Sequence, residues 1–152
     1  MFDEKDLHIL SLLQKNSRIT AQEIGSEIQL SSPAVADRIK KLSDVGIIEQ
    51  FTARLNSKKL GFDLLAFIAL VSSSSDHYED IINNSIKHAS VMECHSITGE
   101  GSHLLKVRIT NSSALEKLLQ DIQGWPGVIR THTSLVMTTY KEVFDLPLKH
   151  NT

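Results

Sequence analysis

The sequence predicts an α+β protein in which a small helical domain, residues 1–60, precedes a domain of βαββαβ order, residues 61–152. Two observations carry this prediction. Apolar residues recur at the spacing of amphipathic helices up to about residue 44. From residue 64 onward they form short β-branched runs, separated by two amphipathic segments. With 41% apolar and 22% charged residues, the 152-residue chain has enough apolar side chains to bury a core in each domain.

Three helices are predicted in the first domain. Leucines and isoleucines between residues 3 and 15 form a broad apolar face, which indicates the first helix. Thr20 stands three residues before Glu23, the spacing of a capping box, so a second helix begins there and runs to about residue 28. Pro33, preceded by two serines that can act as caps, opens a third helix that continues to about residue 44.

The third helix, in "LSSPAVADRIKKL" at residues 30–42, has an apolar side and a polar side. Val35, Ile39 and Leu42 fall on one stripe at about 100° per residue, and this stripe must pack on the first two helices. The opposite arc carries small residues first and charges further along: Pro33, Ala34, Asp37, Lys40 and Lys41, with Arg38 at its edge. Such a surface on the second helix of a pair fits the helix-turn-helix geometry for entering a DNA major groove.

The segment after the third helix, "IIEQFTARLN" at residues 47–56, is β-branched and aromatic with partial alternation. We therefore expect a strand there, as in a winged-helix-like domain, and then a linker around "SKKLG".

The formal net charge of −2 gives no general affinity for nucleic acid. Residues 38–59, however, contain a local excess of cations. The charged residues there are Arg38, Lys40, Lys41, Arg54, Lys58 and Lys59 against Asp44 and Glu49. Phosphate binding requires a local patch of this kind. A charged outer face on a protein-interaction or structural module would look the same, so both interpretations stay open.

Four apolar runs and two amphipathic segments make up the second domain. The predicted strands are 64–71, 91–97, 103–109 and 128–137, and the predicted helices are 77–88 and 113–123. Their order matches the ferredoxin-like fold, an antiparallel sheet with both helices on one face. The first run, "LLAFIALV", is too apolar for a strand with one wet face, so we expect a second sheet to cover that face in a dimer.

Four stretches occur in order across almost the whole chain: "LHILSLLQKNSRIT", "LSSPAVADRIKKLSDVGIIEQFTARLN", "ITGEGSHLLKV" and "WPGV". Together they resemble the Lrp/AsnC (feast/famine) family of bacterial and archaeal transcription regulators. The resemblance implies a sequence-specific DNA-binding regulator with a helix-turn-helix, a β linker and a C-terminal βαββαβ domain. It also implies a homodimer, often assembled into octamers, and an amino-acid effector.

The resemblance assigns residues to double-stranded DNA. They are Arg18, Ser31, Ser32, Pro33, Ala34, Asp37, Arg38 and Lys41. Among them we expect Ser32, Ala34 and Asp37 to face base edges. We expect Arg38 and Lys41 to hold phosphates or a guanine, and Arg18 to contact the DNA backbone.

The resemblance also implies an effector-binding loop. Its residues are Thr98, Gly99, Glu100, Gly101, Ser102 and His103. In similar proteins this loop lies between dimers and carries an aspartate and a tyrosine where this chain has Ser102 and His103. Either Glu100 replaces the aspartate as partner of an ammonium group, or the effector differs, or the protein ignores amino acids. The glycines of the loop fit a plain hairpin turn equally well.

Other chemistries find little support in the sequence. Cys94 is the only cysteine, which excludes an intrachain disulfide and a CxxC metal site. His95, His103 and His132 fall in predicted strands of one sheet, but they lack HxH or HExxH spacing. No nucleophile with a base and no phosphate-binding loop occurs, so we expect no enzyme, cofactor or metal. Because no apolar run approaches about 18 residues, we expect a cytoplasmic protein without a membrane partner.

Two alternative functions stay open at this point. One is an architectural DNA-binding protein of low sequence specificity with the same fold. The other is a metabolite-binding or catalytic ferredoxin-like protein that does not touch DNA.

Overall fold

The computed structural model describes residues 3–148, and its contacts divide the chain into two compact units. The helical unit contains the chain up to Arg54 together with the segment from Lys141, and the β unit is Leu55–Tyr140. The sequence predicts a single division after residue 60, which would place the C-terminal segment in the same domain as the sheet. The residues from Lys141 onward instead belong to the helical unit. In the structure this segment contacts Arg54, far away in sequence, which a local pattern cannot reveal.

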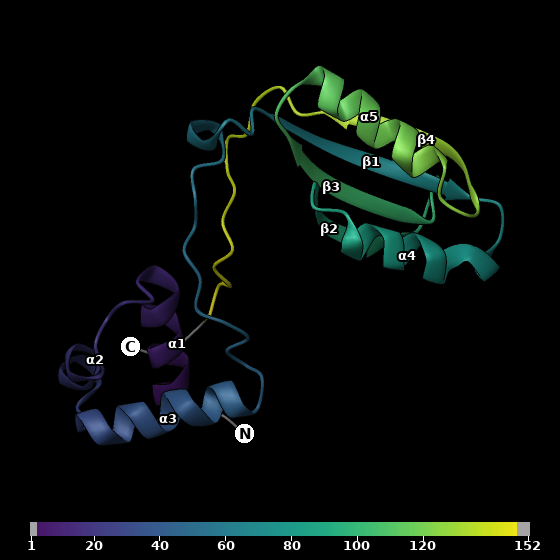
Figure 1. Cartoon of the computed structure of the whole chain (residues 1–152). Helices are drawn as coiled ribbons and strands as arrows, with labels where there is room; N and C mark the ends of the chain where they lie inside the picture. The colour runs from purple at the N-terminus through teal and green to yellow at the C-terminus, as the bar shows by residue number, and fades with distance from the viewer. Residues whose placement is uncertain (1–2, 149–152) are drawn as a thin grey trace. The chain divides into compact units, whose positions relative to one another are not determined.

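The helical unit contains α1 (Glu4–Lys15), α2 (Ala21–Ile28) and α3 (Ser32–Asp44), as the apolar spacing predicts (Figure 1). The capping box of α2 is confirmed. Thr20 Oγ1 accepts a hydrogen bond from the Glu23 N–H at 3.2 Å, and the Glu23 carboxylate accepts one from the Thr20 N–H at 2.7 Å.

One hydrophobic core joins these three helices. Its buried members are Ile9, Leu13, Ile24, Ile28 and Val35. Gly25 of α2 marks a close approach, because a Cβ built there would lie 2.4 Å from the backbone oxygen of Leu30. Because Gly25 has no side chain, the turn between α2 and α3 can pack directly against α2 at this position.

The strand predicted over residues 47–56 is wrong. The chain turns after α3, residues 49–56 have no regular structure, and a short 3₁₀ helix, η1 (Lys58–Leu60), follows. A strand requires hydrogen bonds to a neighbouring strand, and nothing within residues 3–148 pairs with this segment. The helix-turn-helix therefore has no wing strand in the described chain.

The β unit contains a four-stranded antiparallel sheet. Its strands are β1 (Leu64–Ser72), β2 (Val91–Ser96), β3 (His103–Ile109) and β4 (Val128–Leu135), in the order β2-β3-β1-β4. A 3₁₀ turn, η2 (Ser75–His77), and α4 (Tyr78–Lys87) follow β1, and α5 (Ser112–Gln123) connects β3 to β4 (Figure 1). The predicted βαββαβ order, and with it the α+β fold class, is confirmed.

Both helices of the β unit cover the same face of the sheet. Ala66 and Leu70 of β1 are fully buried in one core cluster with Ile81 of α4 and Ile122 of α5. Because side chains alternate along a strand, the residues between them, such as Phe67, point to the opposite face. Phe67 is half-buried there, on a sheet face that neither α4 nor α5 covers.

Because of the close approach at Gly25, we expect replacement of this glycine by alanine to destabilise the protein, whereas the same replacement in a helix usually stabilises it. Gly25→Ala should lower the free energy of unfolding by about 1 to 3 kcal/mol, because the backbone at Leu30 must move. At an ordinary helix position the same change raises stability by roughly 0.5 to 1 kcal/mol. Urea unfolding of the full chain measures the effect, with Ser26→Ala on the exposed side of α2 as control. Equal stability of Gly25→Ala and wild type would contradict this packing.

Candidate functional site

A tight turn sets α3 against α2. Gln29 has a left-handed backbone with φ of 56°, and the N–H of Leu30 donates to the Gly25 carbonyl at 2.9 Å. Ser31 then caps α3, its Oγ accepting from the N–H of Ala34 at 3.4 Å. The turn therefore presents the first residues of α3 immediately beyond the end of α2.

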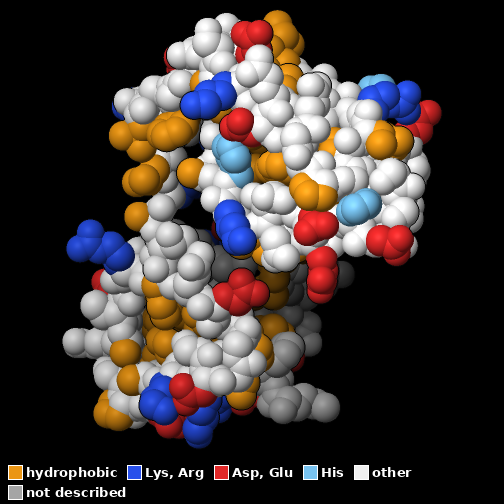
Figure 2. Space-filling model, turned by 45° about the vertical axis from the view of Figure 1, so that its right-hand side comes forward, with side chains coloured by type: hydrophobic (Ala, Val, Ile, Leu, Met, Phe, Trp, Pro, Cys, Tyr) orange, Lys and Arg blue, Asp and Glu red, His pale blue; other side chains and the backbone are white. Residues whose placement is uncertain are grey.

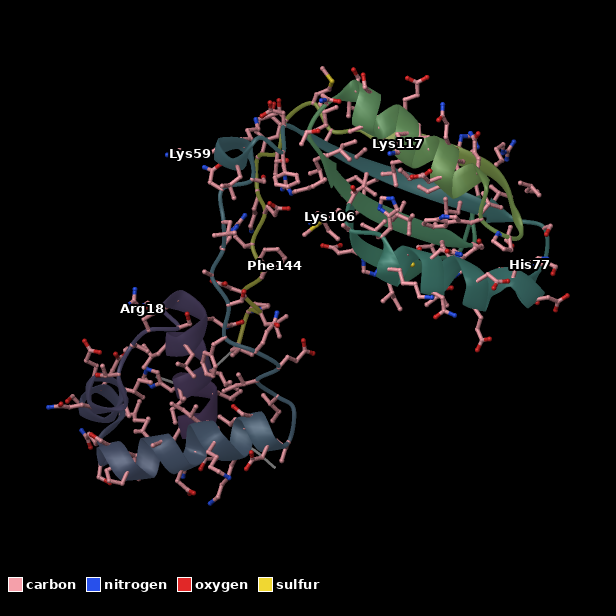
Figure 3. The ribbon with its side chains drawn as sticks, in the orientation of Figure 1. Arg18, Lys59, His77, Lys106, Lys117 and Phe144 are labelled. Carbon is pink, nitrogen blue, oxygen red and sulfur yellow. The ribbon has the colours of Figure 1, made fainter. Side chains whose placement is uncertain are left out.

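The polar side of α3 faces outward, as its periodicity predicts. Val35 and Leu42 are buried, whereas Pro33, Asp37 and Lys41 are exposed. The implied DNA-binding residues thus share one surface, apart from Arg18. Arg18 lies in the α1–α2 connection with its side chain exposed (Figure 3).

Arg38, at the edge of this surface, contacts the start of α1. Its Nη1 donates to Asp6 Oδ1 at 2.7 Å and to Asp3 Oδ2 at 2.9 Å, and these bonds raise the pKa of the guanidinium. The Asp6 backbone N–H, and then Arg38, hold the pKa of Asp3 below its ordinary value. The guanidinium expected to hold a phosphate or guanine instead ties α3 to α1 in this structure.

The lysines of α3 are paired with carboxylates of the same helix. Lys41 Nζ lies 2.8 Å from Asp37 Oδ2, and Lys40 Nζ lies 2.8 Å from Asp44 Oδ2. The hydrogen bond from Lys41 is the main cause of a lowered pKa at Asp37. Figure 2 shows basic and acidic side chains together at the lower end of the view, where α3 lies in Figure 1. Exposed pairs of this kind are worth little, so a phosphate can displace the carboxylates at small cost.

The implied effector loop is a hairpin turn that also contacts β1. The loop joins β2 to β3, and Gly99 has a positive φ of 104°. Ser102 donates to the Leu70 carbonyl through its backbone N–H at 2.8 Å and through its hydroxyl at 3.3 Å. Gly101 lies against the same carbonyl, which a Cβ would approach to 3.0 Å. These contacts hold the loop against the end of β1.

A hollow of about 400 Å³ lies beside this loop. It is lined by Val71, Ser72, Tyr78, Gly99, Glu100, Gly101, Ser102 and Arg130. Four of the six implied effector residues are therefore brought together, while Thr98 and His103 do not line the hollow. Sequence reasoning missed Tyr78 and Arg130. Only the register of the sheet, which pairs Arg130 with Val71, could have revealed Arg130.

His103 is buried behind the hollow, with 1% of its surface exposed. Its Nδ1 lies 3.0 Å from Ser102 Oγ, and its ring meets Tyr78 edge to face at 4.8 Å between centroids. Nε2 has no hydrogen-bond partner among the described residues. Burial lowers the pKa of His103, so the neutral imidazole is favoured. His103 thus supports two residues that line the hollow.

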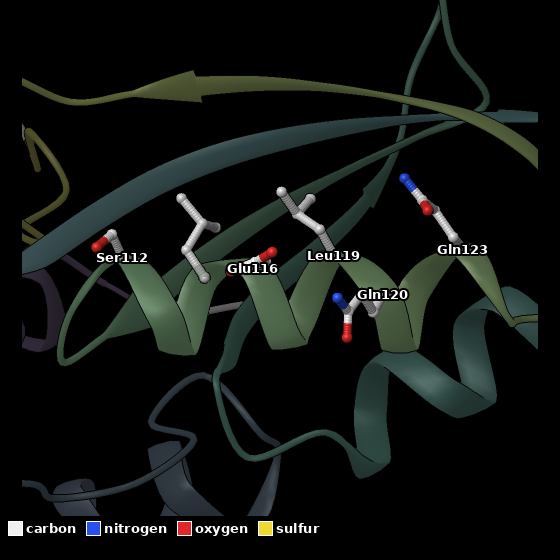
Figure 4. A pocket seen from close by; sticks show the side chains of 6 residues that line it. Ser112, Glu116, Leu119, Gln120 and Gln123 are labelled. Atoms are coloured by element: carbon white, nitrogen blue, oxygen red, sulfur yellow. The ribbon is translucent and has the colours of Figure 1, made fainter.

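A second hollow runs along α5 (Figure 4). Its lining contains leucines, amides, a hydroxyl and one carboxylate, namely Leu115, Leu119, Gln120, Gln123, Ser112 and Glu116. None of these residues belongs to a motif in the sequence, and one carboxylate among neutral groups defines no particular chemistry.

The three histidines considered as metal ligands are not brought together. His95 is on β2 and His132 on β4, the two edge strands of the sheet, and His103 is buried on the helix-covered side. His95 Nε2 lies 3.1 Å from Glu93 instead. Within residues 3–148, no group of three or more histidine, cysteine or acidic side chains could hold a metal ion. That part of the chain also has no helix long and apolar enough to cross a membrane.

Known proteins share both parts of this chain. Residues 2–43 match the AsnC-type helix-turn-helix domain, and residues 64–146 match the Lrp/AsnC ligand binding domain. An HTH-type transcriptional regulator of Pyrococcus abyssi is 37% identical over 147 residues, which cover 97% of each chain. The leucine-responsive regulatory protein of Escherichia coli is 35% identical over 150 residues, covering 97% of this chain and 92% of that protein.

Solved structures share the fold. A transcriptional regulator from Neisseria meningitidis in complex with L-Met gives a TM-score of 0.92 at 32% identity, with 99% of each chain covered. A feast or famine regulatory protein from Mycobacterium tuberculosis complexed with L-methionine gives 0.90 at 29% identity, covering 96% of this chain and 99% of that one. Fold and relatives define the class, that of helix-turn-helix transcriptional regulators. Within that class, the chain belongs to the Lrp/AsnC family.

The contacts of Arg38 predict a structural effect that the α3 lysines do not share. Arg38→Ala should lower the free energy of unfolding by about 1 kcal/mol, because its half-buried side chain joins two helices. Lys41→Ala should change it by less than about 0.5 kcal/mol. Urea unfolding compares the two variants with wild type. An Arg38→Ala protein with the same free energy of unfolding as wild type would show that the ion pair contributes nothing to stability.

The same ion pair gives the helical unit a defined pH dependence. Asp3 has a lowered pKa in the folded chain, so its contribution is present above its ordinary pKa of about 4 and is lost as the pH falls through the lowered value. The stability difference between wild type and Arg38→Ala should therefore shrink in acid. Urea unfolding at pH 7 and at successively lower pH measures it. A difference that stays constant into acid would exclude the Asp3 carboxylate as the partner.

Proposed function

We propose that α3 reads the DNA major groove and that the regulator binds its operator as a homodimer. The observation that carries this proposal is the N-terminal half of α3, where exposed Pro33 and half-buried Ser32 and Ala34 stand just beyond the α2–α3 turn. Small residues permit close approach of the helix to base edges. Two protomers that each bind one half-site bind the operator more tightly than one protomer does.

We assign different roles to the residues of α3. Ser32, Ala34 and Asp37 face base edges, and Asp37 is suited to accept from a cytosine amino group. Lys41 exchanges its carboxylate partner for a phosphate when DNA binds, because its pair with Asp37 is exposed. Arg38 orients α3 through α1, which is why we do not place it on a base.

The homodimer forms through the open face of the sheet in this proposal. Phe67 and Leu104 supply apolar surface on that face, from neighbouring strands. The only charged pair described between β2 and β3 there is Lys106 with Glu93, whose side-chain atoms lie 3.0 Å apart. Arg108 lies on the same face, two residues after Lys106, so a partner sheet that covers this face must either pair its charge or leave it at the rim. Further assembly to an octamer remains an expectation from the family.

The effector we propose for the hollow is a free amino acid. Glu100 and Arg130 place both signs of charge in its lining, which suits the ammonium and carboxylate groups of a zwitterion. Ser102 adds a hydroxyl where the family loop has an aspartate, so Glu100 takes the ammonium. The complexes of two structural relatives with L-methionine support an amino acid as the ligand class.

The alternatives make different predictions about DNA. An architectural protein would bind all sequences with similar affinity, whereas a metabolite-binding protein without a DNA function would bind none. Comparing the protein's own promoter fragment with scrambled DNA separates these cases. We expect no catalytic activity.

The lysine of α3 gives the sharpest test of the DNA-binding surface. Lys41→Ala should weaken binding to the promoter fragment several-fold and reduce the slope of log affinity against log salt by about 1, since one phosphate contact is lost. Fluorescence anisotropy measures both. Lys87→Ala, an exposed lysine on α4, is the matched control and should bind as wild type. Identical salt slopes for all three proteins would exclude Lys41 from the interface.

Arg130 gives the corresponding test of the effector hollow. Arg130→Gln should weaken amino-acid binding at least tenfold, because the carboxylate loses its charged partner. Isothermal titration with L-methionine, L-leucine and L-lysine measures it, and light scattering checks that the assembly is unchanged. Lys117→Gln, at an exposed position of α5 outside the hollow, is the control. Amino-acid binding that is equal in wild type and Arg130→Gln would place the effector elsewhere.

A further inference from the structure

The last described segment of the chain, residues 141–148, returns to the helical unit. The side-chain amide of Gln14 on α1 binds both backbone groups of Leu146: its Nε2 donates to the carbonyl at 3.1 Å, and its Oε1 accepts from the N–H at 2.7 Å. One side chain therefore satisfies a donor and an acceptor of an extended segment, much as a neighbouring strand would. This two-bond contact fixes the segment at one point on α1.

A second contact fixes the segment to the chain that follows α3. The Arg54 Nη2 atom lies 3.2 Å from Glu142 Oε2, and the guanidinium carbon lies 5.5 Å from the centre of the Phe144 ring. Phe144 is labelled in Figure 3. One guanidinium thus makes an ion pair and a cation–π contact with residues two apart. The segment is held at both ends by side chains of the helical unit.

The chain connects the two units twice. It passes from the helical unit to the β unit after Arg54, and it returns after Tyr140. Neither connection has regular structure on the helical side, where residues 49–54 and 141–148 are irregular. A single irregular connection leaves the attached unit free to reorient, whereas a second connection, pinned beside the first, closes a ring and removes most of that freedom.

We propose that residues 141–148 act as a strap that limits the orientations of the DNA-binding helices. Its contacts are side-chain contacts at the surface, and Phe144 and Leu146 remain 67% and 66% exposed. A segment held in this way opens more readily than a packed helix, so the strap is adjustable rather than rigid. In a dimer it would set the distance at which two copies of α3 reach successive half-sites. This inference rests on the proposed DNA-binding function.

The test removes the strap contacts and leaves the DNA-binding surface intact. The variant is Gln14→Ala combined with Glu142→Ala, and a chain that ends at Tyr140 is the second form. The matched control is Gln120→Ala with Glu116→Ala, the same residue types at exposed positions of α5. Fluorescence anisotropy measures the affinity for two sets of duplexes. The first set contains one half-site of the promoter fragment. The second contains two half-sites whose separation is varied in steps of one base pair around roughly 10.5 base pairs.

We expect wild type and the control to prefer one spacing at least fivefold over spacings half a helical turn away. Both strap variants should lose this preference, to within twofold, while single half-site affinity stays the same. An unchanged spacing preference in both strap variants would overturn the proposal. Absence of binding by wild type to every duplex would instead refute the DNA-binding function.

If wild type binds no duplex, a measurement without DNA still tests whether residues 141–148 restrain the helical unit. Nitrogen-15 relaxation of α1–α3 amides reports how fast the helical unit reorients. Opening the strap should shorten the rotational correlation time of these amides relative to those of β1–β4. Equal values in wild type and both strap variants would show that residues 141–148 restrain nothing.

Discussion

The burial of one stripe of α3 against α1 and α2 is the constraint on which the outward polar surface of α3, the proposed DNA-binding surface, depends. Val35 and Leu42 leave water, and Gly25 permits the close approach that this burial requires. Once the stripe is buried, the helical period places Asp37 and Lys41 on the outer side. The ion pairs of Arg38 add a polar link to α1. Packing alone therefore positions the outward polar surface of α3.

Strand pairing plays the corresponding part in the β unit. The two-residue period of β1 sends Leu70 into the core, while its carbonyl accepts the hydrogen bonds of Ser102. The same strand pairs on its other edge with β4, which places Arg130 opposite Val71. The hollow therefore exists only because β1 is central, and its charged lining comes from segments that adjoin β1 on both edges.

The predictions that hold and those that fail differ in the range of the interactions involved. The boundaries of α1, α2 and α3 follow from apolar spacing and from caps such as Thr20 with Glu23, which are neighbours in sequence. The strand predicted over residues 47–56 fails because composition cannot supply the hydrogen-bonding partner that a strand requires. Arg38 shows the same limit: its position on the α3 surface is local information, but its partners lie on α1.

Apart from the strand expected over residues 47–56, the sequence by itself determined the order of the helices and strands, the outward face of α3 and the family, because period, capping and motif spacing are recorded in nearby residues. Only the tertiary structure decided that Arg38 pairs with Asp3 and Asp6, and that residues 141–148 lie with the helical unit. It also decided that Arg130 and Tyr78 share a hollow with the β2–β3 loop. Ion pairs, straps and hollows join residues far apart in the chain, so they form only when the core has fixed which surfaces meet.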